Sequence, residues 1–326
     1  MIKLATVGTS EICRNFLNSA FLTKEFSLEA VYSRKEETGL SFAKEFGCRR
    51  VFTSLEEMAS DEKIEAVYIA SPNAFHFSQS KIFLENGKHV ICEKPAVTCR
   101  KEFEELKEIA DEKGLIYMEA IIPRHAESYC AVKKAFSSIG RVQSARLDFC
   151  QYSSWMPRFL KGERVNIFDM SLHAGTLMDL GVYCVFAAVD FFGVPEKITA
   201  FKTLLPGGAD GSGCAVFEYD GFNAVLTYSK TGQGSLGSEI IGENSALKIR
   251  HISKYSGVSV INADEEKEIC GLFSVNELMK GEAQRFADYI LRFEENKADY
   301  FSASELSKNV HGCLDEIKKS ARLKYQ

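Results

Sequence analysis

The first third of the chain alternates between two hydrophobic periods. Short β-branched or aromatic runs are separated by stretches in which apolar residues recur at helical spacing. Repeated alternation of strand and helix predicts a parallel sheet covered by helices on both faces. Gly47, Gly87 and Gly114 each stand at the end of a helical stretch, where a left-handed cap is expected. The strand-like runs are IKLATV, SLEAVYS, IEAVYIAS, HVICE and LIYMEA, and the helical stretches are SEICRNFLNSAFL, KEETGLSFAKEFG, FHFSQSKIFLENG and RKEFEELKEIADEKG.

From about residue 123 the pattern changes. After the helical stretch AESYCAVKKAFSSIG, longer alternating segments follow, which predict an open, mostly antiparallel sheet arranged as a meander. A helix is expected near residues 175–190, and two more close the chain, VNELMKGEAQRFADYILRFEEN and SASELSKNVHGCLDEIKKSARL. We therefore expect two domains, residues 1–122 and residues 123–326. The alternating segments are RVQSARLDFCQY, KITAFKTLL, GCAVFEYD, FNAVLTYSK and SALKIRHIS.

Composition limits the partners of this chain. Its 326 residues are 45% hydrophobic and 26% charged, with a net charge of -5 and no block of Lys or Arg, so neither nucleic acid nor an anionic membrane is expected to bind. The ten cysteines are scattered without a C-x-x-C pattern, which indicates reduced thiols, a cytoplasmic protein and no metal site. No signal peptide or transmembrane helix is expected, because the longest nearly apolar stretch, YCVFAAVDFFGV, is short and contains Asp190.

A candidate nucleotide site lies at the first strand-to-helix turn, ATVGTSEIC. This turn keeps Gly8 of the dinucleotide pattern G-x-G-x-x-G, but Ser10 and Cys13 occupy the other glycine positions. The helix N-terminus would face a pyrophosphate, with Ser10 as both helix cap and phosphate donor. An ordinary strand-to-helix turn fits the same residues, so both interpretations stay open here. The candidate cofactor contacts in this turn are Gly8, Thr9, Ser10 and Ile12.

The end of the second strand indicates which nucleotide is bound. An NAD site needs an acidic residue about 20 residues beyond the glycine motif to bind the ribose 2'-hydroxyl. Here the sequence VYSRKEE places Ser33, Arg34 and Lys35 at that point. The guanidinium of Arg34 offers planar, bidentate donors to a 2'-phosphate. We therefore predict NADP(H) in preference to NAD(H). The alternative is that Arg34 and Lys35 only begin a solvated helix.

Four further motifs occur in order along the chain. SPNAFH follows the fourth expected strand, EKP the fifth and MEAIIPRH the sixth, and HAGTLMDLGVYCV lies in the second domain. Together they resemble the glucose-fructose oxidoreductase and inositol dehydrogenase (Gfo/Idh/MocA) family, and within it the branch of dimeric trans-dihydrodiol and NADP-dependent D-xylose dehydrogenases. The resemblance implies an N-terminal Rossmann sheet and a C-terminal domain on a large open sheet. It also implies hydride transfer between nicotinamide and a carbinol or carbonyl carbon of a sugar, polyol or dihydrodiol-like substrate.

The motif ICEKP places polar groups directly after a buried strand. The carboxyl ends of strands in a doubly wound sheet face the ligand crevice, so Glu93 and Lys94 are expected to meet ligands. Pro95 keeps Lys94 out of the helical region, and the resemblance implies a Lys94–Pro95 bond that is often cis. It also places Lys94 beside the nicotinamide, where its charge would bind the substrate oxygen, and Glu93 at the nicotinamide ribose or against Lys94. The alternative is a surface ion pair at a helix start.

The motif LMDLGVYCV carries the candidate proton carrier. Asp179 and Tyr183 are four residues apart and would project from one face of a helix. The resemblance places that face over the cofactor, with Tyr183 as the proton acceptor and Asp179 orienting the substrate. A free phenol has a pKa of about 10, so Tyr183 would need the nearby charge of Lys94. The alternative is that Tyr183 packs in an amphipathic helix and Asp179 caps or pairs.

The segment before that helix departs from the pattern of the branch. Relatives usually read RLFDPELGGGA where this chain has NIFDMSLHAGT, so that Asn166 replaces an Arg, Met170 a Pro, and His173 with Ala174 two glycines. These side chains would narrow a space that glycine leaves open, so the individual substrate of a relative is not expected to be the substrate of this chain. His173 is either a substrate ligand or a capping or packing residue.

The resemblance also assigns a second group of cofactor contacts. The loop containing Ser71, Pro72, Asn73 and His76 matches a loop that flanks the nicotinamide in relatives, and Glu119 matches a residue after the sixth strand that touches the cofactor. For His76 the alternative is a helix cap.

The remaining expectations concern the substrate and the assembly. Arg124, Trp155 and Arg158 are candidates to line the substrate mouth. An open sheet with one uncovered face implies a homodimer or a dimer of dimers through that face. Two other functions remain open, namely a non-catalytic nucleotide-binding sugar sensor of the same fold and a reductase of diketones or keto-sugars.

Overall fold

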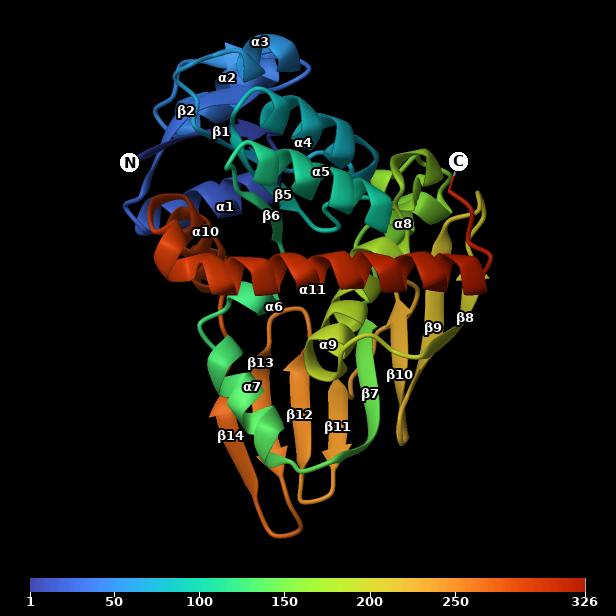
Figure 1. Cartoon of the computed structure of the whole chain (residues 1–326). Helices are drawn as coiled ribbons and strands as arrows, with labels where there is room; N and C mark the ends of the chain where they lie inside the picture. The colour runs from blue at the N-terminus through green and yellow to red at the C-terminus, as the bar shows by residue number, and fades with distance from the viewer. Residues whose placement is uncertain (326) are drawn as a thin grey trace. The chain divides into compact units, whose positions relative to one another are not determined.

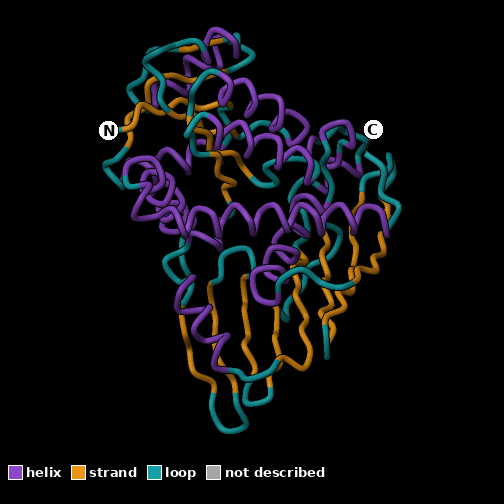
Figure 2. Tube along the Cα trace, viewed as in Figure 1, coloured by secondary structure: helices purple, strands orange, loops and turns teal. Residues whose placement is uncertain are grey.

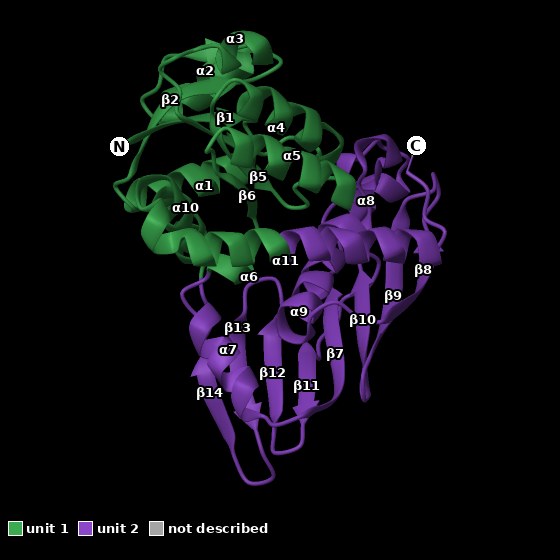
Figure 3. Ribbon diagram, in the orientation of Figure 1, with its two compact units in different colours: residues 1–125, 274–305 green, residues 126–273, 306–326 purple. Residues whose placement is uncertain are grey.

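The computed structural model describes residues 1–325, with the side chains of all except Val275 and Asn276. The chain divides into two compact units, which Figure 3 colours separately. The first contains Met1–His125 and Ser274–Glu305, and the second contains Ala126–Phe273 and Leu306–Gln326. The first unit is therefore built from two separate stretches of chain. The expected division at residue 122 stays a prediction about folding domains.

The first unit contains a six-stranded, all-parallel sheet of order β3-β2-β1-β4-β5-β6. This is the strand order of a Rossmann fold, so the predicted doubly wound sheet is confirmed. The sequence missed β3, because two residues are too few to show a period. The strands are β1 (Ile2–Val7), β2 (Phe26–Tyr32), β3 (Val51–Phe52), β4 (Ala66–Ile69), β5 (His89–Glu93) and β6 (Tyr117–Ala120).

Helices cover both faces of this sheet (Figure 1). Successive strand residues point to opposite faces, and Leu4 and Ala5 of β1 accordingly belong to two different apolar clusters. The predicted helix caps are confirmed at Gly47, Gly87 and Gly114, with φ of 71°, 76° and 65°. The helices are α1 (Glu11–Leu22), α2 (Glu36–Glu45), α3 (Leu55–Ala59), the 3-10 turn η1 (Asn73–Phe75), α4 (His76–Glu85), α5 (Arg100–Glu112) and α6 (Ile122–His125).

Helix α10 (Val275–Leu291) returns late in the sequence to complete this unit. It packs against α1 and α6. Phe286 on α10 stacks on Phe26 of β2, with ring centroids 6.3 Å apart. Met279 and Tyr289 join the same apolar cluster. One face of the Rossmann sheet is therefore closed by a helix from beyond residue 270.

The second unit contains an eight-stranded sheet of order β14-β13-β12-β11-β7-β10-β9-β8 (Figure 2). All neighbours are antiparallel except β7 and β10, which are parallel. The predicted open, mostly antiparallel sheet is confirmed, but the meander is wrong, because β7 lies in the middle of the sheet. The strands are β7 (Val142–Cys150), β8 (Lys197–Leu204), β9 (Asp210–Tyr219), β10 (Phe222–Ser229), β11 (Ser238–Gly242), β12 (Ala246–His251), β13 (Ser256–Ile261) and β14 (Glu266–Cys270).

One face of this sheet is buried under helices, mainly α9 on β7 and β10. The predicted helix near residues 175–190 begins as a wide π turn, η4 (Leu177–Gly181), and continues as α9 (Val182–Phe192). Met170–Phe192 is long and apolar enough to span a membrane, but 83% of its most apolar window is buried inside the protein, as in a core helix. The other helices are α7 (Tyr129–Ser138), α8 (Met156–Leu160), η2 (Asn166–Phe168), η3 (Met170–Leu172) and α11 (Phe293–Ser320), whose residues belong to both units.

Candidate active site

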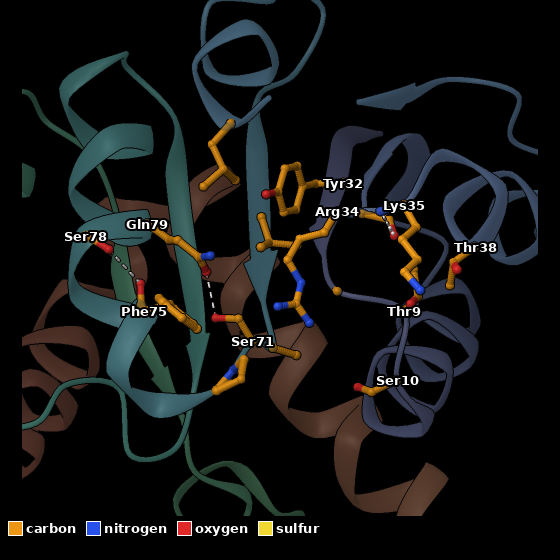
Figure 4. Close-up of a pocket in the computed structure, with 16 residues that line it drawn as sticks. Thr9, Ser10, Tyr32, Arg34, Lys35, Thr38, Ser71, Phe75, Ser78 and Gln79 are labelled. Atoms are coloured by element: carbon orange, nitrogen blue, oxygen red, sulfur yellow. Dashed lines mark hydrogen bonds between the residues drawn. The ribbon is translucent and has the colours of Figure 1, made fainter. Parts of the chain in front are cut away.

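A cavity of about 780 Å³ lies in the first unit, at the carboxyl ends of β1, β2 and β4 (Figure 4). Three segments form its walls: the turn after β1, the turn after β2, and the loop and helix after β4. This is the edge at which doubly wound sheets bind nucleotides. The lining residues are Val7, Gly8, Thr9, Ser10, Tyr32, Ser33, Arg34, Lys35, Thr38, Leu55, Ala70, Ser71, Pro72, Phe75, Ser78 and Gln79.

The turn after β1 needs glycine at position 8. Gly8 has a φ of +116°, and a Cβ there would lie 2.9 Å from the carbonyl oxygen of Ala70, which directly follows the neighbouring strand β4. Ser10 occupies the N-cap of α1, but its hydroxyl makes no capping hydrogen bond and instead lies 3.6 Å from the Cys13 sulfur. The predicted side-chain cap is therefore wrong. Gly8, Thr9 and Ser10 line the cavity, whereas Ile12 is outside its lining.

The turn after β2 brings positive charge to the cavity. Arg34 extends into the space between the turn after β1 and the loop after β4 (Figure 4), and Lys35 and Thr38 lie beside it. The buried Ser33 hydroxyl accepts a hydrogen bond from the Lys35 backbone nitrogen at 3.3 Å. Among the described residues that line the cavity there are two cations and no carboxylate. The donor set therefore fits a phosphate on the ribose better than a free 2'-hydroxyl. Thr38 was missed, because it lies one turn inside α2.

The loop after β4 forms the opposite wall. Ser71 donates a hydrogen bond to the Gln79 side chain at 2.6 Å, and both residues line the cavity with Pro72. Asn73 and His76 do not line it. Gln79 was missed, since a single polar residue on a helix face carries no motif.

His76 links this loop to the ICEKP motif. Its buried ring lies 2.9 Å from the Pro95 carbonyl oxygen through Nδ1 and 2.7 Å from the Ser71 carbonyl oxygen through Nε2. Burial lowers the pKa of the imidazole. The structure thus places His76 inside the first unit, where it joins the two loops without reaching the cavity.

The ICEKP loop itself is held from two sides. The Lys94–Pro95 peptide bond is cis. Tyr68 donates a hydrogen bond from its hydroxyl to Glu93 at 2.6 Å, and the Tyr68 ring stacks on Phe16 with centroids 3.8 Å apart. On the other side, the buried Glu119 carboxylate accepts a hydrogen bond from the Ala96 backbone nitrogen at 2.9 Å. Glu93 and Lys94 are both half-buried.

Glu282 on α10 is a further buried carboxyl group that sequence reasoning missed. It is fully buried, and neither oxygen has a hydrogen-bond partner among the described residues. Burial, and secondly the charge of Glu93, raise the pKa of Glu282 well above its usual value. Glu282 therefore holds its proton more tightly than an exposed carboxyl group does. The burial of Glu282 could not be predicted from the sequence, because acidic residues on amphipathic helices usually lie on the exposed face.

The second unit contains Asp179 on the wide turn and Tyr183 at the start of α9. Single π turns occur often at functional sites. The Asp179 carboxylate forms an ion pair with Lys230, whose side chain is only 7% exposed. Tyr183 is buried and packs its ring edge-on against Phe149, with centroids 5.8 Å apart. Lys230 was missed, because a lone lysine after a strand carries no motif.

The start of the wide turn is fixed by Asp210. Its Oδ2 accepts a hydrogen bond from the Leu177 backbone nitrogen at 2.6 Å, and its carbonyl oxygen accepts one from the Thr176 hydroxyl at 2.8 Å. Burial raises the pKa of Asp210 to about 6. A Cβ at Gly175 would lie 2.0 Å from Asp210 Oδ1, so only glycine fits between them.

The other candidate substrate residues of this unit lie on its loops. His173 has a φ of 51° and stacks on Tyr325, with ring centroids 5.2 Å apart. Trp155 is exposed, and the Arg158 guanidinium lies 5.1 Å from the centre of its ring. Arg158 also forms an ion pair with Glu163 at 2.6 Å. His173 thus packs against Tyr325 in this structure, and its role as a substrate ligand stays a prediction.

Arg124 is placed in the first unit. Its buried guanidinium forms an ion pair with Asp299 at 2.6 Å, and the Tyr289 hydroxyl donates a second hydrogen bond to that carboxylate at 2.6 Å. An arginine held in this way stabilises the junction of α6, α10 and α11. A place for Arg124 at the substrate mouth stays a prediction.

Comparison with known proteins places this site in a class. A family described as "Oxidoreductase family, NAD-binding Rossmann fold" matches residues 2–121. A second family description, "GFO/IDH/MocA C-terminal domain", matches residues 132–248. Together the two matches cover more than half of the chain. The chain belongs to the Gfo/Idh/MocA family, and the resemblance seen in the sequence is confirmed.

Individual relatives agree with this assignment. The scyllo-inositol 2-dehydrogenase (NADP(+)) IolU of Bacillus subtilis is 36% identical over 326 residues, which is 100% of this chain and 98% of that protein. The D-xylose 1-dehydrogenase (NADP(+)) 2 of Haloferax volcanii is 31% identical over 66% of this chain and 65% of its own length. Among solved structures, KijD10, a 3-ketoreductase from Actinomadura kijaniata in complex with NADP and TDP-benzene, superposes with a TM-score of 0.85 at 22% identity, covering 98% of each chain. That likeness shows the fold.

Proposed function

We propose that this chain is an NADP-dependent oxidoreductase that acts on a carbinol or carbonyl carbon of a sugar or polyol. The observation that carries the proposal is the cavity at the edge of the Rossmann sheet, whose described lining contains Arg34 and Lys35 and no carboxylate. The similarity over the full length to an NADP(+)-dependent scyllo-inositol dehydrogenase supports it.

The cofactor-binding residues are assigned by the shape and charge of the cavity. The pyrophosphate would lie at the N-terminus of α1, where Gly8 leaves room for it and the backbone of Thr9 and Ser10 faces it. The 2'-phosphate would lie against Ser33 and Arg34. When bound, the nicotinamide supplies the hydride chemistry. The residues of the protein hold the cofactor in position and supply the positive charge that binds its phosphates.

Three side chains are proposed to handle the proton and the substrate. Tyr183 takes the proton of the reacting hydroxyl. Lys94 donates a hydrogen bond to the same oxygen, and its positive charge lowers the pKa of the phenol. Asp179 accepts a hydrogen bond from the substrate and orients it. Glu93 and Glu119 hold the loop that carries Lys94 through their contacts with Tyr68 and Ala96.

The first experiment is a fluorescence titration of the protein with NADPH and NADH, followed by a turnover screen of polyols and sugars with the preferred oxidised cofactor. We expect NADPH to bind more tightly and at least one vicinal polyol to be oxidised. Equal or tighter NADH binding would contradict the assignment of Arg34. NADPH binding without turnover on the whole panel would indicate a sensor. A much faster reverse reaction would indicate a carbonyl reductase.

The second experiment tests the roles of Lys94 and Tyr183. Lys94→Ala and Tyr183→Phe should each lower turnover by about a hundredfold or more without changing NADPH affinity. If both act on one substrate oxygen, the double variant should be little worse than the poorer single variant. Lys81→Ala is the control, because Lys81 makes a surface ion pair with Glu105 at 2.6 Å. Independent, multiplying effects would contradict a shared oxygen.

We further propose a homodimer through the outer face of the eight-stranded sheet. The register places Phe201, Val225 and Ile241 on one face, where they are exposed, while Leu226 and Ile240 point to the buried face. Exposed apolar side chains on three strands of one sheet face favour a second sheet as their cover. Sedimentation equilibrium of wild type and Val225→Asp should give a dimer and a monomer, respectively. A wild-type monomer would contradict this proposal.

A cytoplasmic location is also proposed. All ten cysteines lie among the described residues, and none of them forms a disulfide. Reduced cysteines in this number are typical of a reducing compartment. Fractionation of expressing cells, followed by detection of the protein in the soluble cytoplasmic fraction, is the direct measurement.

A further inference from the structure

Lys230 is a buried cation for which the sequence motifs provide no role. Lys230 directly follows β10. Its backbone nitrogen donates a hydrogen bond to the Gly211 carbonyl oxygen at 2.9 Å, and its carbonyl oxygen accepts one from the Ser153 nitrogen at 3.0 Å. The side chain is 7% exposed. A lysine ammonium is seldom buried unless it is paired. The position of this charge is therefore set by the sheet.

The partner of Lys230 is the carboxylate of Asp179, which is 37% exposed. The pair is thus asymmetric, since the ammonium is enclosed and the carboxylate remains accessible on one side. An ionised carboxylate accepts hydrogen bonds without donating any, and the ion pair with Lys230 holds it in one direction. Such a group selects hydroxyl donors from a ligand.

Asp210 connects this pair to the backbone of the wide turn. Asp210 accepts the Leu177 nitrogen at 2.6 Å, and the charge of Lys230 acts on Asp210 as well. Lys230 therefore pairs with Asp179 on the turn, and its charge also lowers the pKa of Asp210, which binds the start of the turn. This arrangement fixes the direction of Asp179 relative to Tyr183, which begins the next turn.

We propose that Lys230 is a positioning residue that holds Asp179 as the acceptor for a second hydroxyl, next to the reacting carbinol, so that the preferred substrates are vicinal diols. The proposal rests on the proposed function, in which Tyr183 takes the proton of the reacting hydroxyl. Asp179 and Tyr183 are four residues apart, which corresponds to about 6 Å along a helix axis. Two side chains at that spacing can each bind one of two neighbouring oxygens of a substrate.

The test compares Lys230→Met and Lys230→Arg with wild type. Methionine keeps the length and apolar stem of lysine and removes the charge. We expect KM for the best vicinal polyol to rise by about tenfold or more, the scale of one charge-assisted hydrogen bond, with a smaller change in kcat and no change in NADPH affinity. Arginine should restore part of the loss. The control is Lys197→Met, which removes an exposed ion pair with Glu218 on the same sheet.

The substrate side of the test uses a deoxy analogue that lacks the hydroxyl next to the reacting carbon. Its inhibition constant against the intact polyol is measured, because inhibition does not require turnover. In wild type the analogue should bind about tenfold more weakly than the polyol, and in Lys230→Met the two should bind about equally. Equal losses for polyol and analogue would overturn the role of Lys230.

Two further outcomes are decisive. Wild-type turnover together with an unchanged KM in Lys230→Met would overturn this inference alone, and the proposed function would stand. Absence of turnover by wild type on every polyol would overturn the proposed function and this inference with it. Should the methionine variant not fold, Lys230→Leu provides the same comparison, because leucine also removes both the charge and the donor.

Discussion

The Glu119 carboxylate accepts a hydrogen bond from the backbone nitrogen of Ala96 at 2.9 Å. Ala96 follows the Lys94–Pro95 bond directly, so Glu119 fixes the loop that carries the proposed catalytic lysine. Both groups of this bond are buried. The contact therefore matters for the direction of Lys94 and for stability at the same time.

Glu119→Leu should lower turnover by about ten- to a hundredfold, because the Lys94 side chain loses its fixed direction. The unpaired Ala96 nitrogen should also lower the free energy of unfolding by about 1–3 kcal/mol. Steady-state kinetics and denaturant unfolding measure the two effects. Glu119→Gln is the matched control, since its carbonyl oxygen can still accept the bond. A leucine variant with normal turnover would show that this bond does not position Lys94.

Arg34→Ala should weaken NADPH binding and leave NADH binding almost unchanged. A charge-assisted hydrogen bond to a phosphate contributes about 1.5–3 kcal/mol, which corresponds to about a 10- to 100-fold change in Kd. Fluorescence titration with both cofactors gives the ratio. Arg100→Ala serves as the control, because Arg100 forms an ion pair with Glu104 on α5 at 2.8 Å, away from the cavity lining. Equal losses for both cofactors would place Arg34 elsewhere than at the 2'-phosphate.

Asp210 should make the second unit less stable as the pH rises. Its folded pKa is raised from 3.8 to about 6 by burial, so the folded protein keeps a proton that the unfolded chain has released. Stability then falls between about pH 4 and pH 6, by about 3 kcal/mol at most, and stays constant above that range. Asp210→Asn lacks this titration. Its free energy of unfolding relative to wild type should therefore increase from pH 4 to pH 7 in urea denaturation, and a constant difference would contradict the raised pKa.

Tyr325 allows a prediction in which two substitutions have different results. Its ring packs on an apolar cluster that contains Phe168 and Met170, and it stacks on His173. Its hydroxyl is buried without a hydrogen-bond partner among the described residues. Tyr325→Ala should lower the melting temperature by several degrees, whereas Tyr325→Phe should be neutral or stabilising, because it removes an unpaired polar group. A phenylalanine variant as unstable as the alanine variant would reveal a partner for the hydroxyl.

Local periodicity in the sequence predicted most of the fold. The strands and helices of the first 120 residues follow from apolar spacing, and only short pieces such as β3 and α3 were missed. The order of the second sheet was not predictable in this way, because β7 pairs with β10 and β11 across long stretches of chain. Strand pairing at such separation depends on tertiary packing, which no local period records.

The candidate site was predictable where a motif carries it. Gly8, Arg34 and Ser71 were found because the turns of a nucleotide-binding sheet have known positions, and all three line the cavity. Lys230 and Glu282 were missed, since each is a lone charged residue whose surroundings come from distant elements. Their burial is a property of the folded chain alone. The assigned roles of Lys94, Asp179 and Tyr183 stay predictions until the variants are measured.

The late return of α10 has a consequence for biosynthesis. The apolar face of the Rossmann sheet that receives Phe286 and Met279 is translated first, yet its cover leaves the ribosome only after β14 is complete. A nascent chain that ends before residue 274 therefore exposes the apolar side chains beside α1 that α10 later covers. We expect a chaperone to bind this exposed surface. Expression of an isolated nucleotide-binding fragment should for the same reason require a fusion that restores α10.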